Sequence, residues 1–123
     1  MSCIFRVVGE VLDVDRMVLV ASIQPYLIWR KGEKKGGSDR VHERSGAFYL
    51  VSDADMNEMP RQIAEATEYL EKNTSEIASI VSFPGVASAV LDFASSLEGD
   101  QFNQSCRFSI NFLKLAVAAG VEI

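Results

Sequence analysis

The stretch around Pro60 constrains the fold of this chain most, because its apolar residues recur with the period of one helical face. Met59, Ile63, Ala66 and Leu70 follow the spacing i, i+4, i+7 and i+11, with glutamates and a lysine on the opposite side. Proline suits the first turn of a helix, and this spacing is typical of a helix that buries one face. The segment therefore predicts an amphipathic helix that must pack against another element.

Segments rich in β-branched and aromatic residues lie on both sides of this helix, and we expect each of them to form a strand. They span 3–8, 26–30, 46–52, 86–95 and 121–123, with a short extended piece at 107–108. Both faces of the segment 46–52 are apolar, which indicates a central strand rather than an edge strand.

Three further helices are expected, and each begins next to a residue that can cap it. The first lies in the segment 13–22, with Asp13 or Asp15 as its N-cap, and the others span 76–82 and 110–119. Asn73 indicates a stop between the helix around Pro60 and the one at 76–82, so we expect two separate helices there. Ser109 is the expected N-cap of the last helix, and Gly120 is expected to end it.

The order of these elements places helices between strand pairs and contains no Gly-rich nucleotide-binding fingerprint, which predicts an α+β fold. We expect a mostly antiparallel sheet with helices on one face, in an arrangement that resembles the ferredoxin-like one. A chain of 123 residues has the length of one domain, so residues 1–123 are expected to form a single α+β domain.

The charge of the chain is unevenly distributed along its length. The net charge is −5, yet half of the twelve basic residues fall between Arg30 and Arg44. Six basic and three acidic residues give the segment 30–44 a charge of +3, which leaves −8 for the rest of the chain. We interpret the basic segment as an exposed loop around Gly36 and Gly37. The acidic remainder favours basic protein partners and disfavours nucleic acids and anionic lipids.

Composition also predicts the compartment. No apolar run approaches the roughly 18 residues that a membrane-spanning helix needs. Arg6, Glu10 and Asp13 interrupt the first positions, where a secretory signal needs an unbroken apolar run. We therefore expect a cytoplasmic protein that does not interact with membranes.

Residues suited to catalysis are scarce in this sequence. The single histidine, His42, lies in the basic segment, so a Ser-His-Asp triad or a Cys-His dyad has no evident partner, and a solvated loop residue is the simpler interpretation. Cys3 and Cys106 are far apart in the sequence, and we expect buried thiols, with a structural disulfide as the alternative. We predict no catalytic residues and a protein that is not an enzyme.

A cluster of acids is the strongest candidate for a metal site. Asp53, Asp55 and Glu58 follow a predicted strand, but the glycine and the final glutamate of a calcium-binding loop are missing. Acids in front of a helix also cap it and offset its dipole, which is the simpler interpretation. We therefore expect neither a metal ion nor a cofactor.

The best candidate for a recognition surface is a cluster around the only tryptophan. Trp29 stands directly before Arg30 and Lys31 at the end of a predicted strand, and Arg44 closes the basic segment. Tryptophan and arginine are enriched in interface hot spots, although core packing is the simpler interpretation of the tryptophan. We predict that these four residues form a binding site.

Several short motifs give the chain a resemblance to a known family. They are a strand ending at Gly9 and followed by Leu12-Asp13, Pro25 ahead of Trp29-Arg30-Lys31-Gly32, Ser45-Gly46, Phe108-Ser109, and Leu115-Ala116 with Gly120. In these motifs the sequence resembles the bacterial family called domain of unknown function 4279, although Phe48 stands where members often have tryptophan. The resemblance implies a small stand-alone α+β domain and transfers no functional residues.

Two functions follow from these observations. The first is a non-catalytic protein-binding module, such as an acidic immunity or inhibitor protein that neutralises a basic toxin or enzyme domain. The second is a sensor or carrier whose small anionic ligand docks at the turn formed by Trp29, Arg30 and Lys31. A homodimer is a further expectation, because the segment 121–123 can lie at a free sheet edge.

Overall fold

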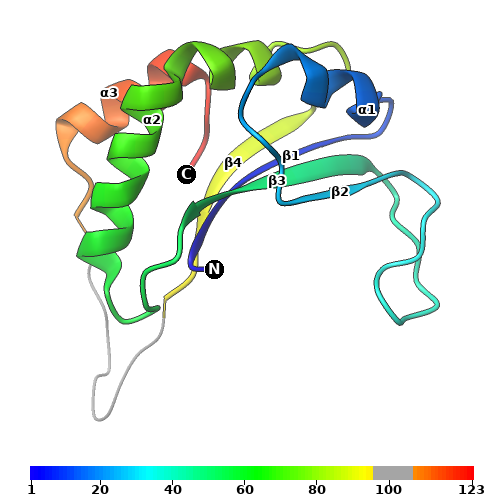
Figure 1. The fold of residues 1–123 in the computed structure, drawn as a ribbon, viewed down its shortest axis with the longest axis horizontal. Coiled ribbons are helices and arrows are strands. Elements are labelled where there is room, and N and C mark those ends of the chain that lie inside the picture. The colour runs from blue at the N-terminus through cyan, green and yellow to red at the C-terminus, as the bar shows by residue number, and fades with distance from the viewer. Residues whose placement is uncertain (96–106) are drawn as a thin grey trace.

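The structure is a computed structural model that describes residues 1–95 and 107–123, arranged as Figure 1 shows. In chain order its elements are β1 (Cys3–Gly9), α1 (Val14–Met17), the 3-10 helix η1 (Val18–Val20), β2 (Leu27–Trp29), β3 (Ser45–Ser52), α2 (Met59–Val81), β4 (Ser88–Phe93) and α3 (Ile110–Ala119). Cys106, which was expected to be a buried thiol or a disulfide partner, lies outside the described residues.

Four strands form one sheet in the order β2-β3-β1-β4, and every pair of neighbours is antiparallel. The helices lie on one side of this sheet (Figure 1). The prediction of an α+β fold with an antiparallel sheet and helices on one face is therefore confirmed. From β1 to β4 the elements follow the β-α-β-β-α-β order of ferredoxin-like arrangements.

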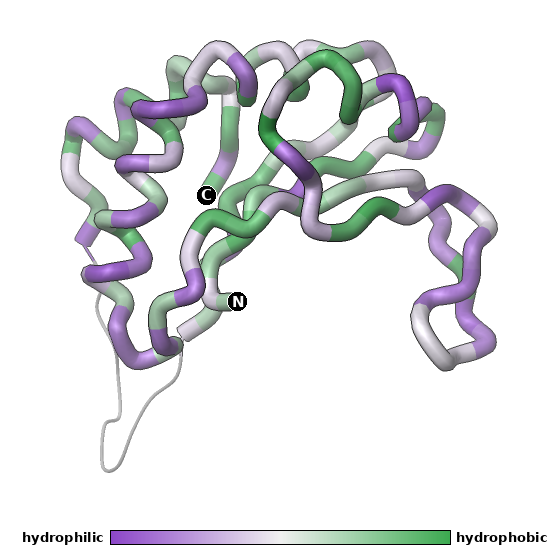
Figure 2. Tube along the Cα trace, in the orientation of Figure 1, coloured by the Kyte–Doolittle hydropathy of each residue, from purple (hydrophilic) through white to green (hydrophobic). Residues whose placement is uncertain are grey.

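The core lies between the sheet and the helices. Alternate residues of β1, namely Cys3, Phe5 and Val7, are fully buried because successive side chains of a strand point to opposite faces. Ala47 and Tyr49 continue this layer on β3, which lies between two other strands as the sequence predicts. Figure 2 shows hydrophobic residues along the strands and hydrophilic residues along the hairpin beyond β2.

The first helix is shorter than the predicted 13–22. Asp13 is its N-cap, and the Asp13 side chain accepts a hydrogen bond from the Arg16 N–H at 3.3 Å. The α-helix ends at Met17, and a single 3-10 turn follows it. The Ser22 N–H then donates to the Glu76 carboxylate on α2. Contact with α2 therefore competes with continuation of the helix.

The prediction of two helices on either side of Asn73 is borne out, because the 23 residues of α2 comprise two helical segments that meet at a kink. The kink lies at Asn73 itself, which has non-helical angles (φ −122°, ψ 22°). Leu70 and Ile77 on either side of the kink are both fully buried. Burial of both halves in the same core keeps them joined where local capping preferences favour a stop.

The C-terminal part of the chain follows its local sequence closely. The Ser109 side chain accepts a hydrogen bond from the Phe112 N–H at 3.0 Å, and Gly120 ends α3 with a left-handed φ of 77°. The expected strand 121–123 is reduced to one parallel bridge between Val90 and Glu122. Glu122 pairs with the outer edge of β4 here, so the segment 121–123 does not form the edge strand that was expected to pair with a second copy. In the described parts of the chain, no helix is long and apolar enough to cross a membrane.

Candidate functional site

The face of the sheet opposite the helices is uncovered, and apolar side chains occupy most of its outward positions. Ile4 and Val8 on β1, Phe48 and Leu50 on β3, and Val90 on β4 point to this face and are half-buried or exposed. When one face of an antiparallel sheet meets water, its outward residues are usually polar. An apolar face of this kind indicates a surface that contacts a ligand or a partner.

Residues 31–44 form a paired arm, which we call the basic hairpin, rather than an irregular loop. The Gly32 N–H donates to the His42 carbonyl, and the His42 N–H donates to the Glu33 carbonyl, both at 2.8 Å. Lys34 and Val41 form the next bridge towards the tip. The basic hairpin extends from the end of the sheet and bends away from the helices, past the open face (Figure 1).

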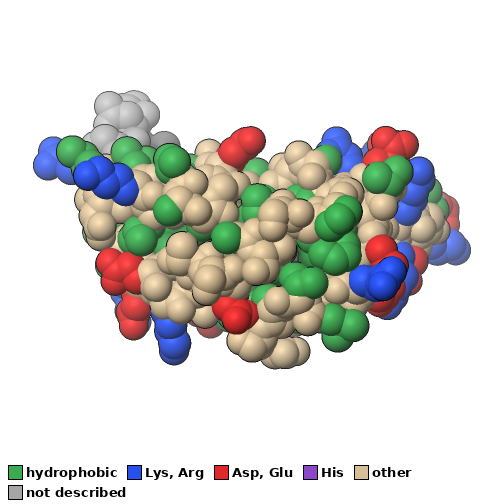
Figure 3. Space-filling model, turned by 90° about the horizontal axis from the view of Figure 1, so that it is seen from above, with side chains coloured by type: hydrophobic (Ala, Val, Ile, Leu, Met, Phe, Trp, Pro, Cys, Tyr) green, Lys and Arg blue, Asp and Glu red, His purple; other side chains and the backbone are tan. Residues whose placement is uncertain are grey.

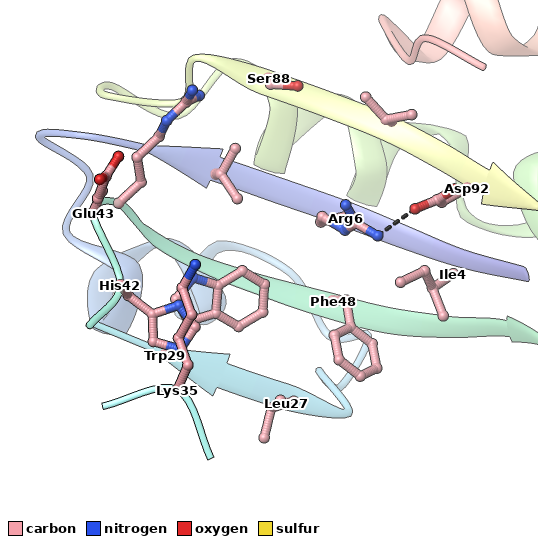
Figure 4. A pocket seen from close by; sticks show the side chains of 13 residues that line it. Ile4, Arg6, Leu27, Trp29, Lys35, His42, Glu43, Phe48, Ser88 and Asp92 are labelled. Carbon is pink, nitrogen blue, oxygen red and sulfur yellow. Dashed lines mark hydrogen bonds and ion pairs between the residues drawn. The ribbon is translucent and has the colours of Figure 1, made fainter. Parts of the chain in front are cut away.

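A hollow of about 680 Å³ lies where the open face meets the basic hairpin, and we call it the open-face hollow. Trp29 stacks on His42 with ring centroids 5.4 Å apart and an interplanar angle of 23°. Phe48 lies beside Trp29 with a centroid distance of 6.4 Å. Figure 4 shows these rings and Leu27 along one side of the hollow. The tryptophan is therefore a wall of a hollow and not a fully buried core residue.

Gly46 allows the tryptophan to lie against the sheet. It is the partner of Trp29 in the pairing of β2 with β3. A Cβ atom on Gly46 would stand 2.6 Å from Trp29 Cζ2 and 2.6 Å from the Val7 carbonyl oxygen. Since real Cβ atoms do not approach other atoms so closely, a side chain at this position would displace Trp29 from the sheet.

Six charged or titratable side chains line the open-face hollow and differ in their partners: the cations Arg6, Lys35 and Arg44, the acids Glu43 and Asp92, and His42. Arg6 pairs with Asp92 across β1 and β4, as the dashed line in Figure 4 shows. His42 is held in the stack with Trp29. Within residues 1–95 and 107–123, no carboxylate forms an ion pair with Lys35 or Arg44. These two cations are available to an anionic group of a ligand.

The structure separates the four residues predicted as a binding site. Trp29 and Arg44 line the open-face hollow. Arg30 donates two hydrogen bonds, at 2.9 and 2.6 Å, to the Asp15 carboxylate of α1. Lys31 lies 3.6 Å from a carboxylate oxygen of Glu10. Arg30 and Lys31 thus have intramolecular partners.

Alternation along β2 explains this separation. Trp29 points to the open face, so the next residue, Arg30, is directed towards the helical side, where Asp15 lies. The hydrogen bonds from Arg30 hold the pKa of the Asp15 carboxyl below its ordinary value. Both side chains remain exposed, so the pair contributes little to stability.

The sequence did not single out three residues that line the open-face hollow. Lys35, His42 and Phe48 follow one another at intervals of seven and six residues in the sequence and reach the same hollow through the pairing of the hairpin and of β3. The alternation in the segment 46–52 already predicted that Phe48 and Leu50 share one face. Nothing in the sequence showed that this face would be left uncovered, since apolar residues on both faces usually indicate burial on both.

The acids considered as a metal site have other partners or none at all. Asp53 pairs with the N-terminal ammonium at 2.9 Å, and Glu58 lies 3.7 Å from Arg61. Glu58 is the N-cap residue of α2, but its side chain makes no capping hydrogen bond, which differs from the expected role. No group of three or more His, Cys, Asp or Glu side chains in the described residues is placed to hold a metal ion.

The buried titratable groups lie on the other side of the sheet from the open-face hollow. Burial raises the pKa of the Cys3 thiol from 9.0 to about 12, and the charge of Asp92 acts in the same direction. Burial also raises the pKa of the Tyr49 hydroxyl to about 12. Both groups are held in their neutral forms, in which a thiol or phenol is a poor nucleophile.

Comparison of the chain with protein-family models, curated proteins and solved structures finds no match. The function proposed below therefore rests on the geometry of the open-face hollow.

Proposed function

We propose that this protein is a non-catalytic binding domain whose open-face hollow takes a small ligand with an apolar body and one anionic group. The observation that supports this most is the combination of an apolar sheet face, a half-buried tryptophan and two cations without described carboxylate partners. A hollow of about 680 Å³ falls in the usual range for small-molecule sites, about 300 to 1,000 Å³.

Each part of the hollow has a role in this proposal. The apolar body of the ligand packs on Phe48, Val90 and the face of Trp29. Its carboxylate or phosphate accepts hydrogen bonds from Lys35 and Arg44, because charge-assisted hydrogen bonds are the strongest that such groups make. Arg6 is neutralised by Asp92 and positions the ligand without binding its charge.

The single tryptophan makes the proposal directly testable, because Trp29 fluorescence reports on the hollow alone. Octyl phosphate is the anionic probe, and octanol is the neutral probe of the same chain length. We expect saturable quenching or a blue shift with octyl phosphate, and binding of octanol that is weaker by about tenfold or more, as the loss of a charge-assisted hydrogen bond implies.

A matched pair of variants separates local contact from general attraction. Arg44→Gln removes a cation of the hollow, and Lys34→Gln removes an exposed cation of the same hairpin that does not line it. We expect Arg44→Gln to weaken octyl phosphate binding by about tenfold and Lys34→Gln to change it less than about twofold. Equal effects of the two variants, or equal affinity for octanol, would contradict a specific anion site.

The alternative is an acidic immunity or inhibitor protein for a basic partner, which rests on the charge of −8 outside the segment 30–44. Its support is weaker, because several of these acids already have partners. Glu10 and Asp15 pair with cations of the segment 30–44, Glu65 with Arg61, and Glu76 accepts the Ser22 N–H. Recovery of a stoichiometric basic protein from the native host, sensitive to salt, would favour this alternative.

Two further proposals rest on the sequence alone. Residues such as Gly32, Ser45 and Gly120 support membership of the bacterial family of unknown function 4279. Ordinary globular composition and dispersed cysteines support a cytoplasmic location.

A further inference from the structure

We infer that a second copy of this chain covers the open face, so that two sheets facing each other enclose the open-face hollow as a chamber. The inference rests on the proposed function in so far as that chamber is the ligand site. The second copy covers a surface that the fold of one chain leaves exposed to solvent.

The hollow of a single chain is one-sided. Leu27 is 52% exposed and Leu50 is 37% exposed, although both are apolar residues on the open face or at its border. Small-molecule sites usually bury about 70 to 90% of the ligand surface, which a sheet with only one wall does not achieve. A second sheet supplies the missing wall and removes the exposed apolar side chains from water.

The uncovered surface continues along the whole length of β1. A second hollow of about 250 Å³ shares Ile4, Arg6, Phe48 and Asp92 with the first and extends to Met1. Together the two hollows run from the basic hairpin to the N-terminal end of the sheet. This elongated shape fits another sheet better than it fits an isolated small molecule.

The sheet face alone is too small for a stable dimer, so the hairpins must add contact area. The four strands have 7, 3, 8 and 6 residues, and at about 3.3 Å per residue and about 4.8 Å between strands they cover roughly 380 Å². A stable interface takes about 800 Å² from each partner. The sheet face alone therefore provides about half of what is needed, and the basic hairpin that projects past it provides further contact area (Figure 1).

The distribution of charge favours a pair related by a two-fold axis that lies between the two open faces, perpendicular to their strands. The basic hairpin lies at one end of the sheet, beyond Trp29. Asp53 and Asp55 follow β3 at the other end, where Asp53 pairs with the N-terminal ammonium and Asp55 is exposed. When two such faces meet in antiparallel orientation, the cationic end of each copy lies over the acidic end of the other. Opposite charges then meet at both ends of the same self-complementary contact.

The helical side of the molecule offers a competing surface. Figure 3 shows hydrophobic side chains gathered around α1 and η1, where Leu19 is 81% exposed and Val20 is 43% exposed. This patch lacks both the hollow and the opposed charges of the open face. It provides the matched control for the test.

The test measures the mass of the protein in solution by light scattering and sedimentation, from about 1 to about 500 µM chain. We expect the wild type to reach twice the chain mass and the dimer to dissociate as salt is raised. Leu27→Glu places a charge on the open face and is expected to give a monomer. Leu19→Glu places the same charge on the helical side and is expected to leave the dimer unchanged.

The outcomes are separable. Circular dichroism checks that Leu27→Glu folds, and Lys35→Glu, which alters the hairpin without touching the sheet, provides a second variant that is expected to weaken the dimer. A wild type that stays monomeric throughout, or a dimer broken by Leu19→Glu and not by Leu27→Glu, overturns the inference.

If the protein is monomeric and still binds octyl phosphate, the proposed function holds without the dimer. If the dimer forms and Trp29 does not respond to the probe, the dimer stands and the proposed function fails.

Discussion

At the scale of single residues, the fate of each polar group depends on which face of the sheet it occupies. Cys3 and Tyr49 are on the inner face, where burial keeps them neutral. Arg6 and Asp92 are on the outer face and pair with each other in contact with water. The strand alternation predicted from the sequence therefore separates buried, neutral groups such as the Cys3 thiol from charged groups such as Arg6 that a ligand can contact.

We predict that Cys3 does not react with thiol reagents in the folded protein. In a Cys106→Ser background, the Cys3 thiol is expected to react with a disulfide reagent at pH 8 only after the chain is unfolded, because burial blocks access and suppresses the thiolate. Modification of the native protein at the rate of the unfolded chain would contradict this.

The raised pKa of Cys3 also predicts a dependence of stability on pH. The unfolded thiol titrates near 9.0 and the folded thiol near 12, so the unfolded chain loses its proton first as pH rises. The contribution to stability is therefore complete below pH 9 and is lost between about pH 9 and 12. Denaturant unfolding of the wild type should show a steeper alkaline decline than that of Cys3→Ala.

Tyr49 provides a test of a buried hydroxyl. Its hydroxyl has no hydrogen-bond partner among residues 1–95 and 107–123, while its ring stacks on Phe5 with centroids 5.6 Å apart. We expect Tyr49→Phe to keep the stack, to remove the cost of an unpaired buried hydroxyl, and to raise stability by about 1 kcal/mol. Tyr26→Phe, at a residue that is 60% exposed, is the neutral control. A loss of stability in Tyr49→Phe would instead indicate a bonded hydroxyl.

At the scale of elements, local sequence decided where segments begin and end more reliably than how they join. The cap of α3 at Ser109 and its end at Gly120 follow the sequence closely. Asn73 has the local break that was expected, but the core joins the two halves into α2. In the segment 121–123 the residues favour a strand, but the tertiary structure allows only one bridge.

Gly120 tests the end of α3. Its φ of 77° is unfavourable for residues with a side chain, and a Cβ atom would stand 3.1 Å from Val81 Cγ1 of α2. We expect Gly120→Ala to lower the free energy of unfolding by about 1 kcal/mol. Gly37→Ala is the control, because no atom lies within 4 Å of a Cβ there, and we expect a change within about 0.5 kcal/mol.

At the scale of the whole molecule, the helices cover one face of the sheet and leave the other to solvent, with the basic hairpin beyond its end (Figure 1). If a second copy covers that face, stability depends on concentration, because association draws the equilibrium towards the folded state. We expect the Tm to rise by about 3 °C for each tenfold increase in chain concentration. Leu27→Glu is expected to abolish this dependence, and a wild-type Tm independent of concentration would argue against the dimer.

The sequence by itself determined the fold class, the central position of β3, the caps of the last helix and the face that each strand residue occupies. These features depend on the period of apolar residues and on local hydrogen bonds, which neighbouring residues decide. Two members of the candidate site, Trp29 and Arg44, were also found from composition.

Only the tertiary structure decided that the outer face stays uncovered, that Lys35 and His42 reach the same hollow as Trp29, and that Arg30 and Lys31 are held by acids elsewhere. Each of these outcomes depends on contacts across the sheet, the hairpin or α1 that the local pattern of residues does not specify. An apolar strand residue has the same pattern whether its neighbour is a helix or solvent, so the pattern predicts the face and the assembled fold decides what covers it.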